Sequence, residues 1–244
     1  MPSMPRPRSL LLVRHGESVG NLASARAERE GAERLDLRTR DADTPLSPRG
    51  EEQARATGVW FASLPAQERP TAVWSSPYLR ARQTASLAVP EGTRVRLDER
   101  LRDRELGVLD RLTWRGVQRL HPDEAERRRH LGKFYHRPSG GESWADVALR
   151  VRAFLDDVLR APADGPVLLV THDAVVMLIR YVLEELTEED LMDLERGRSV
   201  RNASVTRLDA SDDGWRVAMF DEVGHLAALD APVTEHEGTD DRGR

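Results

Sequence analysis

The sequence contains no cysteine, and its only lysine is Lys133. Without thiols the chain can form no disulfide, use no thiolate nucleophile and bind no metal through cysteine. It also lacks any stretch of about 20 apolar residues, the length needed to span a membrane. The apolar run behind Arg8 is too short for a secretory signal. These absences lead us to expect a cytoplasmic protein that does not enter a membrane.

No excess of positive charge is present either, because 37 Lys and Arg residues face 42 Asp and Glu residues, for a formal net charge of −5. The charges are mixed along the chain and form no basic stripe, so we expect no nucleic-acid partner. No His and Asp residues have the spacing of a metal site, so we expect neither a metal nor a cofactor. The sequence leaves a homodimer open.

The length of 244 residues fits one α/β domain. We predict a single domain over residues 9–229, with flexible termini at 1–8, rich in Pro and Arg, and 230–244, which is polar.

Two short apolar runs end in a histidine. Residues 10–13 predict a strand buried on both faces, and Arg14 and His15 follow it directly. Residues 167–170 repeat this pattern, and His172 follows after one threonine. Ligands of open α/β sheets bind beyond the carboxyl ends of the strands. If these strands are parallel, the side chains meet at one edge of the sheet.

A third strand end carries an arginine. Residues 71–74 predict a strand, after which Ser76 and Pro77 are typical of a helix N-cap and first helical position. That start places Arg80 in the first turn of the helix, near the same edge of the sheet. Taken alone, Arg80 is equally compatible with a solvated helix residue.

The rest of the chain predicts alternating helices and strands. We expect a helix capped by Ser47, a strand at 95–97, a charged helical segment at 110–137 broken at Pro122, a helix capped by Ser143, apolar and capped helices at 174–186 and after Thr187, and an antiparallel pair at 200–208 and 215–223. This order predicts an α/β three-layer sandwich, in which helices flank a mostly parallel central sheet.

Two arginines and two histidines at one edge suit a tetrahedral dianion such as phosphate. Guanidinium groups bind phosphate oxygens in pairs, and a neutral imidazole can attack phosphorus to form a covalent intermediate. The surrounding cations disfavour protonation of His15, which keeps it nucleophilic near neutral pH. A leaving alkoxide also needs a proton, so a carboxylic acid must stand nearby.

Three ordered motifs resemble the histidine phosphatase superfamily, also called phosphoglycerate mutase-like. They are Leu12-Val-Arg-His-Gly-Glu17 with Asn21, then Ser75-Ser-Pro-Tyr-Leu-Arg-Ala-Arg-Gln-Thr84, then Val170-Thr-His172. The resemblance implies the phosphoglycerate mutase-like fold and His15 as the phosphorylated nucleophile. It implies that Arg14, Arg80 and His172 bind the phosphate and that Asn21 adds a hydrogen bond.

Residues 133–144 resemble a segment of the fructose-2,6-bisphosphatase domain within this superfamily. In that domain a Gln follows the second histidine and an Arg comes four residues later, where this chain has Asp173 and Met177. Both positions would contact the sugar bisphosphate, so Asp173 is a candidate substrate-binding residue but the substrate itself is not implied. Four residues are either a substrate lid or a solvated charged face: Arg129, Lys133, Tyr135 and Arg137.

Three carboxyl groups are candidates for the general acid. The family places a Glu four residues before a glycine, and Asp103 stands there before Gly107. Asp103 is therefore our expected acid, although its side chain is one methylene shorter. Glu105 lies two residues further along, and a distant branch of the superfamily uses the aspartate of a His-Asp pair, here Asp173.

We therefore expect a metal-independent phosphomonoester hydrolase that acts through a phosphohistidine on a small phosphorylated metabolite, with sugar phosphates among the candidates. A phosphoglycerate-type mutase is an alternative, although the Trp-containing segment expected after Asn21 in mutases is absent. A non-catalytic phospholigand-binding module is a further alternative, but such a module would normally have lost the nucleophile or an arginine. We expect Glu17 to be structural and the other histidines, His121, His130, His136, His225 and His236, to be solvated.

Overall fold

The computed structural model describes residues 6–197 and 199–235. Within them, six strands form one sheet in the order β3-β2-β4-β1-β5-β6. The strands are β1 (Ser9–Arg14), β2 (Ala72–Ser75), β3 (Val95–Leu97), β4 (Val167–Thr171), β5 (Val205–Ser211) and β6 (Gly214–Glu222). Strands β1 to β4 run parallel to one another, and β5 pairs antiparallel with both β1 and β6. The predicted α/β class with a mostly parallel sheet is confirmed.

Helices connect the strands in the expected order. They are α1 (Val19–Glu30), α2 (Pro48–Ser63), α3 (Leu79–Ala88), α4 (Trp114–Leu120), α5 (Pro122–Tyr135), α6 (Trp144–Arg160), α7 (Asp173–Leu183), α8 (Glu188–Gly197) and α9 (Gly224–Ala227), with short 3₁₀ turns η1 (Asp41–Asp43), η2 (Ala66–Glu68), η3 (Glu99–Leu101) and η4 (Gly107–Leu109). No helix in this part of the chain is long and apolar enough to cross a membrane.

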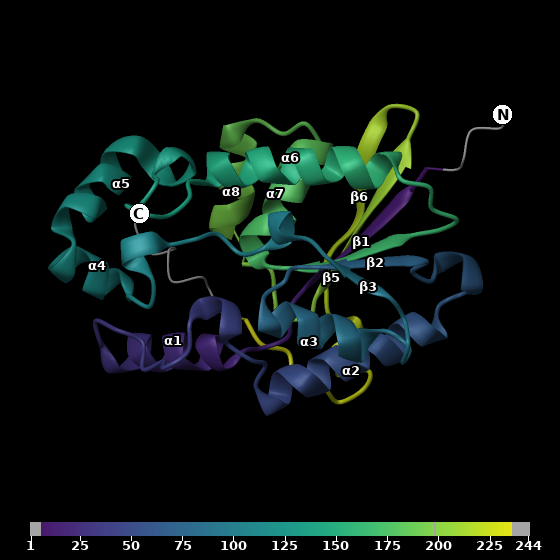
Figure 1. Cartoon of the computed structure of the whole chain (residues 1–244), viewed down its shortest axis with the longest axis horizontal. Helices are drawn as coiled ribbons and strands as arrows, with labels where there is room; N and C mark the ends of the chain where they lie inside the picture. The colour runs from purple at the N-terminus through teal and green to yellow at the C-terminus, as the bar shows by residue number, and fades with distance from the viewer. Residues whose placement is uncertain (1–5, 198, 236–244) are drawn as a thin grey trace.

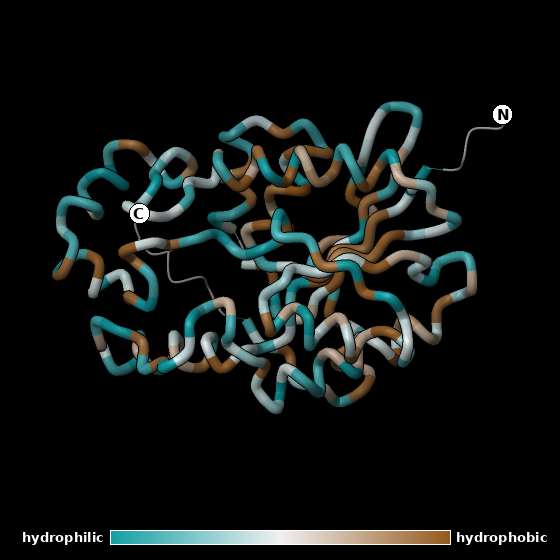
Figure 2. Tube along the Cα trace, in the orientation of Figure 1, coloured by the Kyte–Doolittle hydropathy of each residue, from teal (hydrophilic) through white to brown (hydrophobic). Residues whose placement is uncertain are grey.

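Helices cover both faces of the sheet, which makes the three predicted layers. In Figure 1, α6, α7 and α8 lie on one side of the sheet and α2 and α3 on the other. Along β1, Leu10 and Leu12 pack against α6 and α7, whereas Leu11 and Val13 pack against α2 and α3. Side chains that alternate between two buried faces explain why all four are apolar. Figure 2 accordingly shows the central strands as the most hydrophobic part of the fold.

The predicted helix starts at Ser47 and Ser143 are confirmed. The Ser47 hydroxyl accepts a hydrogen bond from the Gly50 N–H at 3.0 Å. At α6, the Ser143 hydroxyl accepts from the Asp146 N–H at 3.1 Å, and the Asp146 carboxylate accepts from the Ser143 N–H at 2.8 Å. This reciprocal capping box fixes the start of the helix whose apolar stripe fills the core above the sheet.

The predicted helix start at Ser76 is wrong. Helix α3 begins at Leu79, and its N-cap, Tyr78, makes no side-chain cap. The Ser76 N–H instead donates to the Val170 carbonyl at 2.9 Å, which extends the pairing of β2 with β4 past the end of the strand. Because this bond holds Ser76 in the extended chain, the helix starts later and the Ser76 hydroxyl is available for the site.

Both ends of the described chain make backbone hydrogen bonds to the fold. The carbonyls of Pro232 and Thr234 accept hydrogen bonds from Gln53 at 2.7 Å and from the Asn202 N–H at 3.1 Å. The Arg8 carbonyl accepts from the Ala210 N–H at 2.8 Å. Residues 1–5 and 236–244 lie outside the described residues, and the domain boundary at 9–229 and the flexible termini stay predictions.

Two histidines predicted to be solvated are buried. His136 places Nε2 3.0 Å from a carboxylate oxygen of Glu124, and His225 places Nε2 3.2 Å from the Thr57 hydroxyl. A polar partner removes most of the cost of burying an imidazole, and the local sequence does not reveal a partner that is distant along the chain. His236 lies outside the described residues.

Candidate active site

The ends of β1 and β4 bring two histidines together. Arg14 pairs with Thr171 in the parallel register, so His15 and His172 both leave the sheet at the same level. The His15 N–H donates to the Thr171 carbonyl at 2.9 Å, and the two imidazole centroids lie 5.1 Å apart. Two segments 157 positions apart thus meet at the edge that the strand pattern predicts.

The hydrogen bonds of His15 assign its tautomer. Nδ1 lies 2.7 Å from the Gly16 carbonyl oxygen, which can only accept, so Nδ1 carries the proton. Nε2 then accepts from Arg80 Nε at 3.2 Å. Burial lowers the pKa of His15 well below 6.5, and the charges of Arg80, His172 and Arg14 lower it further. The imidazole is therefore neutral near pH 7, with the lone pair of Nε2 directed at Arg80.

This environment predicts the titration of His15 in the free protein. Because a lowered pKa disfavours the imidazolium, the His15 ring should remain neutral as the pH falls through 6.5, the ordinary value. ¹⁵N-detected NMR of the ring nitrogens should show a midpoint below 6.5, with the resonances assigned by their loss in His15→Asn. A midpoint above 6.5 would contradict the pocket described here.

His172 is oriented by Ser76. The Ser76 hydroxyl accepts from the Tyr78 N–H at 3.2 Å and lies 2.8 Å from His172 Nε2. Nδ1 of His172 lies 3.2 Å from Oδ2 of Asp103, a carboxylate oxygen that only accepts, which assigns the ring proton to Nδ1 and makes Nε2 the acceptor of the Ser76 hydroxyl. Burial lowers the pKa of His172, although Asp103 opposes the shift. His172 is thus a neutral, buried imidazole whose Nδ1 faces Asp103. The sequence signal for Ser76 was its place just beyond the end of β2.

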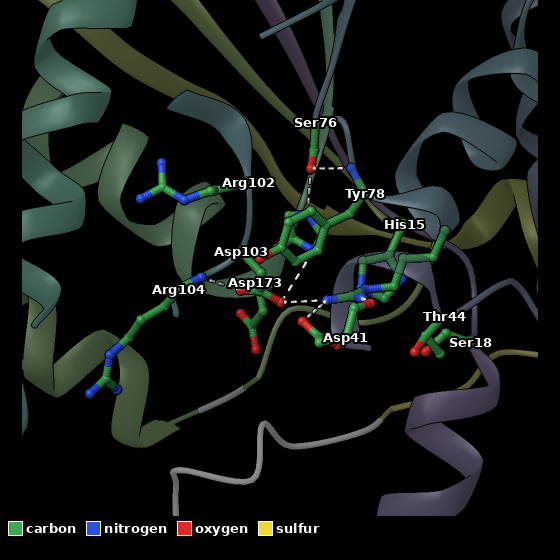
Figure 3. Close-up of polar contacts among 12 residues, drawn as sticks. His15, Ser18, Asp41, Thr44, Ser76, Tyr78, Arg102, Asp103, Arg104 and Asp173 are labelled. Carbon is green, nitrogen blue, oxygen red and sulfur yellow. Dashed lines mark hydrogen bonds and ion pairs between the residues drawn. The ribbon is translucent and has the colours of Figure 1, made fainter. Parts of the chain in front are cut away.

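Arg80 is buried beside His15 and is not a solvated helix residue, since it is 4% exposed. Its guanidinium donates to both carboxylate oxygens of Asp41, at 2.9 and 3.1 Å, and to the Asp41 carbonyl at 2.8 Å. It also donates to Asp103 Oδ2 at 3.0 Å. Figure 3 shows Asp41 and Asp103 pointing toward the same region of the site as His15. No motif in the sequence indicated Asp41.

Arg14 and Asp173 line the other side of the site. Arg14 is buried, donates to the Val200 carbonyl and lies 3.8 Å from Asp173 Oδ2. Asp173 accepts from the Ser199 hydroxyl at 2.9 Å and from the Val200 N–H at 3.3 Å. Burial raises the pKa of Asp173, which Arg14 and Ser199 oppose. Asp173 thus ties the loop before β5 to the start of α7.

Asp103 faces the two histidines, whereas Glu105 points elsewhere. Burial alone would raise the pKa of Asp103, but its contacts with His172 and Arg80 hold it well below its usual range. Asp103 lines the cavity of the site. Glu105 does not, is half exposed, and accepts a hydrogen bond from the Tyr78 hydroxyl at 2.6 Å. The geometry therefore favours Asp103 over Glu105 as the carboxyl group next to a bound ligand.

The segment that carries Asp103 is held from behind by an ion pair. Arg150 donates to the carbonyls of Arg102 and Asp103 at 3.0 and 3.1 Å. Glu142 accepts from Arg150 Nε at 3.0 Å and from the Glu105 N–H at 3.2 Å. Because these hydrogen bonds hold the backbone on both sides of Asp103, the position of its Cα and Cβ atoms is fixed.

Asn21 lines the cavity, but its carbonyl oxygen is already engaged. Oδ1 accepts from the N–H and the hydroxyl of Ser18, both at 3.0 Å, in the capping box of α1, which leaves Nδ2 as its donor. Among the proposed lid residues, Lys133 alone lines the cavity, and it pairs with Glu195. Arg129 is exposed, and Tyr135 and Arg137 pair with Glu188 and Asp146.

The site opens into a cavity of ≈ 180 Å³. His15, Arg14 and Arg80 line it, and the rest of the lining mixes apolar and charged side chains, including Leu35, Leu37, Leu106, Asp110, Arg111 and Lys133. In residues 6–197 and 199–235, no group of three or more His, Asp or Glu side chains is arranged to hold a metal ion.

Known proteins resemble this chain in sequence and in fold. Residues 10–222 match the model of the histidine phosphatase superfamily, branch 1. A protein of Yersinia enterocolitica named "Probable phosphoglycerate mutase GpmB" is 31% identical over 231 residues, which cover 93% of this chain and 97% of that protein. A mycobacterial glucosyl-3-phosphoglycerate phosphatase is similar in structure, with a TM-score of 0.70 and 28% identity over 88% of this chain and 100% of that one. The alpha-ribazole phosphatase of Shigella flexneri shares the fold, with a TM-score of 0.70 and 20% identity over 88% and 96% of the two chains.

Proposed function

Since the chain belongs to the histidine phosphatase superfamily, we propose that it hydrolyses phosphomonoesters without a metal, through a phosphohistidine on His15. The observation that carries the proposal is the unprotonated Nε2 of His15, which lies 3.2 Å from Arg80 Nε, with Arg14 in the same cavity lining and the His172 ring 5.1 Å away. A nucleophile among three cation or N–H donors fits a tetrahedral dianion better than any other ligand class.

In the first step, Nε2 of His15 bonds to phosphorus as the bond from phosphorus to the leaving oxygen breaks. Arg14, Arg80 and the Nδ1–H of His172 stabilise the charge on the three equatorial oxygens. Asp103 gives its proton to the leaving alkoxide. In the second step, Asp103 takes a proton from water, whose oxygen attacks phosphorus and releases His15 and inorganic phosphate.

Asp103 must gain a proton before it can give one. In the free protein its contacts with His172 and Arg80 favour the carboxylate. A phosphate dianion bound to Arg80 offsets the charge of the guanidinium and adds negative charge next to Asp103, and both changes raise the pKa of the carboxyl group. Asp103 therefore gains its proton when the substrate binds, either from the phosphate or from solvent.

The cavity of ≈ 180 Å³ suits a small phosphorylated metabolite as the substrate. Its mixed lining fits a leaving group that has both polar and apolar parts, and sugar phosphates are among the candidates. We keep cytoplasmic location, the absence of a nucleic-acid partner and the open question of a homodimer as expectations for the intact protein.

A phosphoglycerate mutase is the second candidate, because relatives 30–32% identical over more than 90% of this chain bear that name. A mutase keeps its phosphohistidine until a second acceptor arrives, whereas a hydrolase passes it to water. Two measurements separate these activities. With a panel of phosphorylated metabolites, we expect release of inorganic phosphate. With 3-phosphoglycerate and 2,3-bisphosphoglycerate, rapid formation of 2-phosphoglycerate would favour the mutase.

Metal independence is tested on p-nitrophenyl phosphate. Because two arginines and two histidines already supply the positive charge that a metal would bring, the rate after dialysis against EDTA should equal the rate before it. Inorganic phosphate release should match p-nitrophenolate release after the first turnover. A loss of about tenfold or more that magnesium restores would show that the reaction needs a Lewis acid. No hydrolysis of any ester would favour a binding module.

A further inference from the structure

The guanidinium of Arg80 has no N–H group left for a phosphate in this structure. Its Nε–H donates to His15, and its four terminal N–H groups meet the carbonyl and both carboxylate oxygens of Asp41 and one oxygen of Asp103. A ligand that binds the terminal nitrogens of Arg80 must therefore first displace a carboxylate. The question is which of the two carboxylates gives way.

Asp41 holds Arg80 in the manner of a phosphate. Its Oδ1 and Oδ2 accept from the two terminal nitrogens of Arg80 at 2.9 and 3.1 Å, a two-pronged arrangement that phosphate oxygens also adopt with arginine. Asp103 contributes a single contact at 3.0 Å. The Asp41 carboxylate thus occupies the face of Arg80 on which two phosphate oxygens would bind.

Asp41 is also easier to displace than Asp103. Its side chain is 45% exposed, against 29% for Asp103. It belongs to the three-residue turn η1, whose N-cap makes no side-chain hydrogen bond, whereas Arg150 and Glu142 pin the backbone around Asp103. Because the Asp41 carboxylate is exposed, it is hydrated by water when it leaves Arg80, and its displacement leaves no buried unpaired charge.

We propose that Asp41 is an affinity-determining residue that competes with phosphate for Arg80. Substrate enters by replacing the Asp41 carboxylate on the guanidinium, and the return of Asp41 favours the release of inorganic phosphate. The inference rests on the proposed function only in requiring that the ligand of Arg80 is a phosphate group.

The test measures binding of inorganic phosphate and of orthovanadate by calorimetry to the full-length protein. Asp41→Asn keeps the shape but removes the charge, and Asp41→Ala removes both contacts. We expect both variants to bind either anion about tenfold more tightly, since two charge-assisted hydrogen bonds no longer compete. KM for p-nitrophenyl phosphate should fall in parallel.

Asp43→Asn is the matched control. Asp43 lies in the same turn, is 65% exposed, and its carboxylate is 3.9 Å from Arg40 and makes no contact with Arg80. The Asp43→Asn substitution removes the same charge two positions away from Asp41. Anion affinity should stay within about twofold of wild type, because exposed charges contribute little free energy.

Unchanged or weaker anion binding by both Asp41 variants would overturn the proposal, as would an equal gain in Asp43→Asn. The two claims fail separately. If the Asp41 variants bind anions more tightly but the protein hydrolyses no ester, Asp41 competes with phosphate and the proposed hydrolysis is wrong. If the protein hydrolyses esters but the Asp41 variants bind anions as wild type does, the hydrolysis stands and the role of Asp41 is wrong. Thermal unfolding of each variant, with and without phosphate, verifies that the compared proteins are folded.

Discussion

Replacing His15 with alanine is expected to lower turnover by about 10⁴-fold or more, because it removes the atom that forms the covalent intermediate in the proposed mechanism. The remaining arginines and His172 would still bind phosphate, so anion affinity should survive while chemistry stops. Wild-type protein quenched during turnover of a radiolabelled ester should carry phosphate that is stable to alkali and labile to acid. The His15→Ala variant should carry none.

The matched control is another buried histidine. His225 is 5% exposed and bonded to Thr57, and the described structure places it outside the cavity lining. His225→Gln should be labelled as fully as wild type, even if its unfolding midpoint falls. Normal turnover by His15→Ala, or acid-labile phosphate that persists in it, would place the covalent chemistry on another side chain and overturn the mechanism.

Strand ends made the centre of the site predictable from sequence. Arg14, His15 and His172 directly follow or close apolar runs, and parallel pairing of such runs can only bring their carboxyl ends together. Arg80 was predictable because its helix α3 follows shortly after the end of β2. The capping box at Ser143 was equally local, since all of its partners lie within four positions.

The missed residues depend on contacts that no local pattern encodes. Asp41 lies in an exposed turn and meets Arg80 from 39 positions away, with no motif around it. Ser76 carried a signal that also fitted a helix cap, and the pairing of β2 with β4 decided between the two. The hydrogen bonds of Pro232 and Thr234 likewise depend on Gln53 and Asn202, which are near only in the folded chain.

The identity of the general acid should appear as a dependence on the leaving group. If Asp103 donates the proton, Asp103→Asn should slow the transfer to His15 from sugar phosphates by about 10²–10⁴-fold, the usual worth of general acid catalysis. The effect on p-nitrophenyl phosphate should be much smaller, because p-nitrophenolate leaves without a proton. Single-turnover labelling of His15 measures this step apart from the hydrolysis that follows.

Two carboxylates serve as controls in the same measurement. Asp173→Asn loosens the Ser199–Val200 loop beside Arg14, so we expect it to slow both leaving groups by similar factors. Glu105→Gln keeps an acceptor for the Tyr78 hydroxyl outside the cavity lining and should stay close to wild type with both substrates. A leaving-group dependence that follows Asp173 would instead assign the proton to the residue after His172. The raised pKa of Asp173 would then be the property that matters, since a carboxyl group that keeps its proton nearer neutral pH is the better donor.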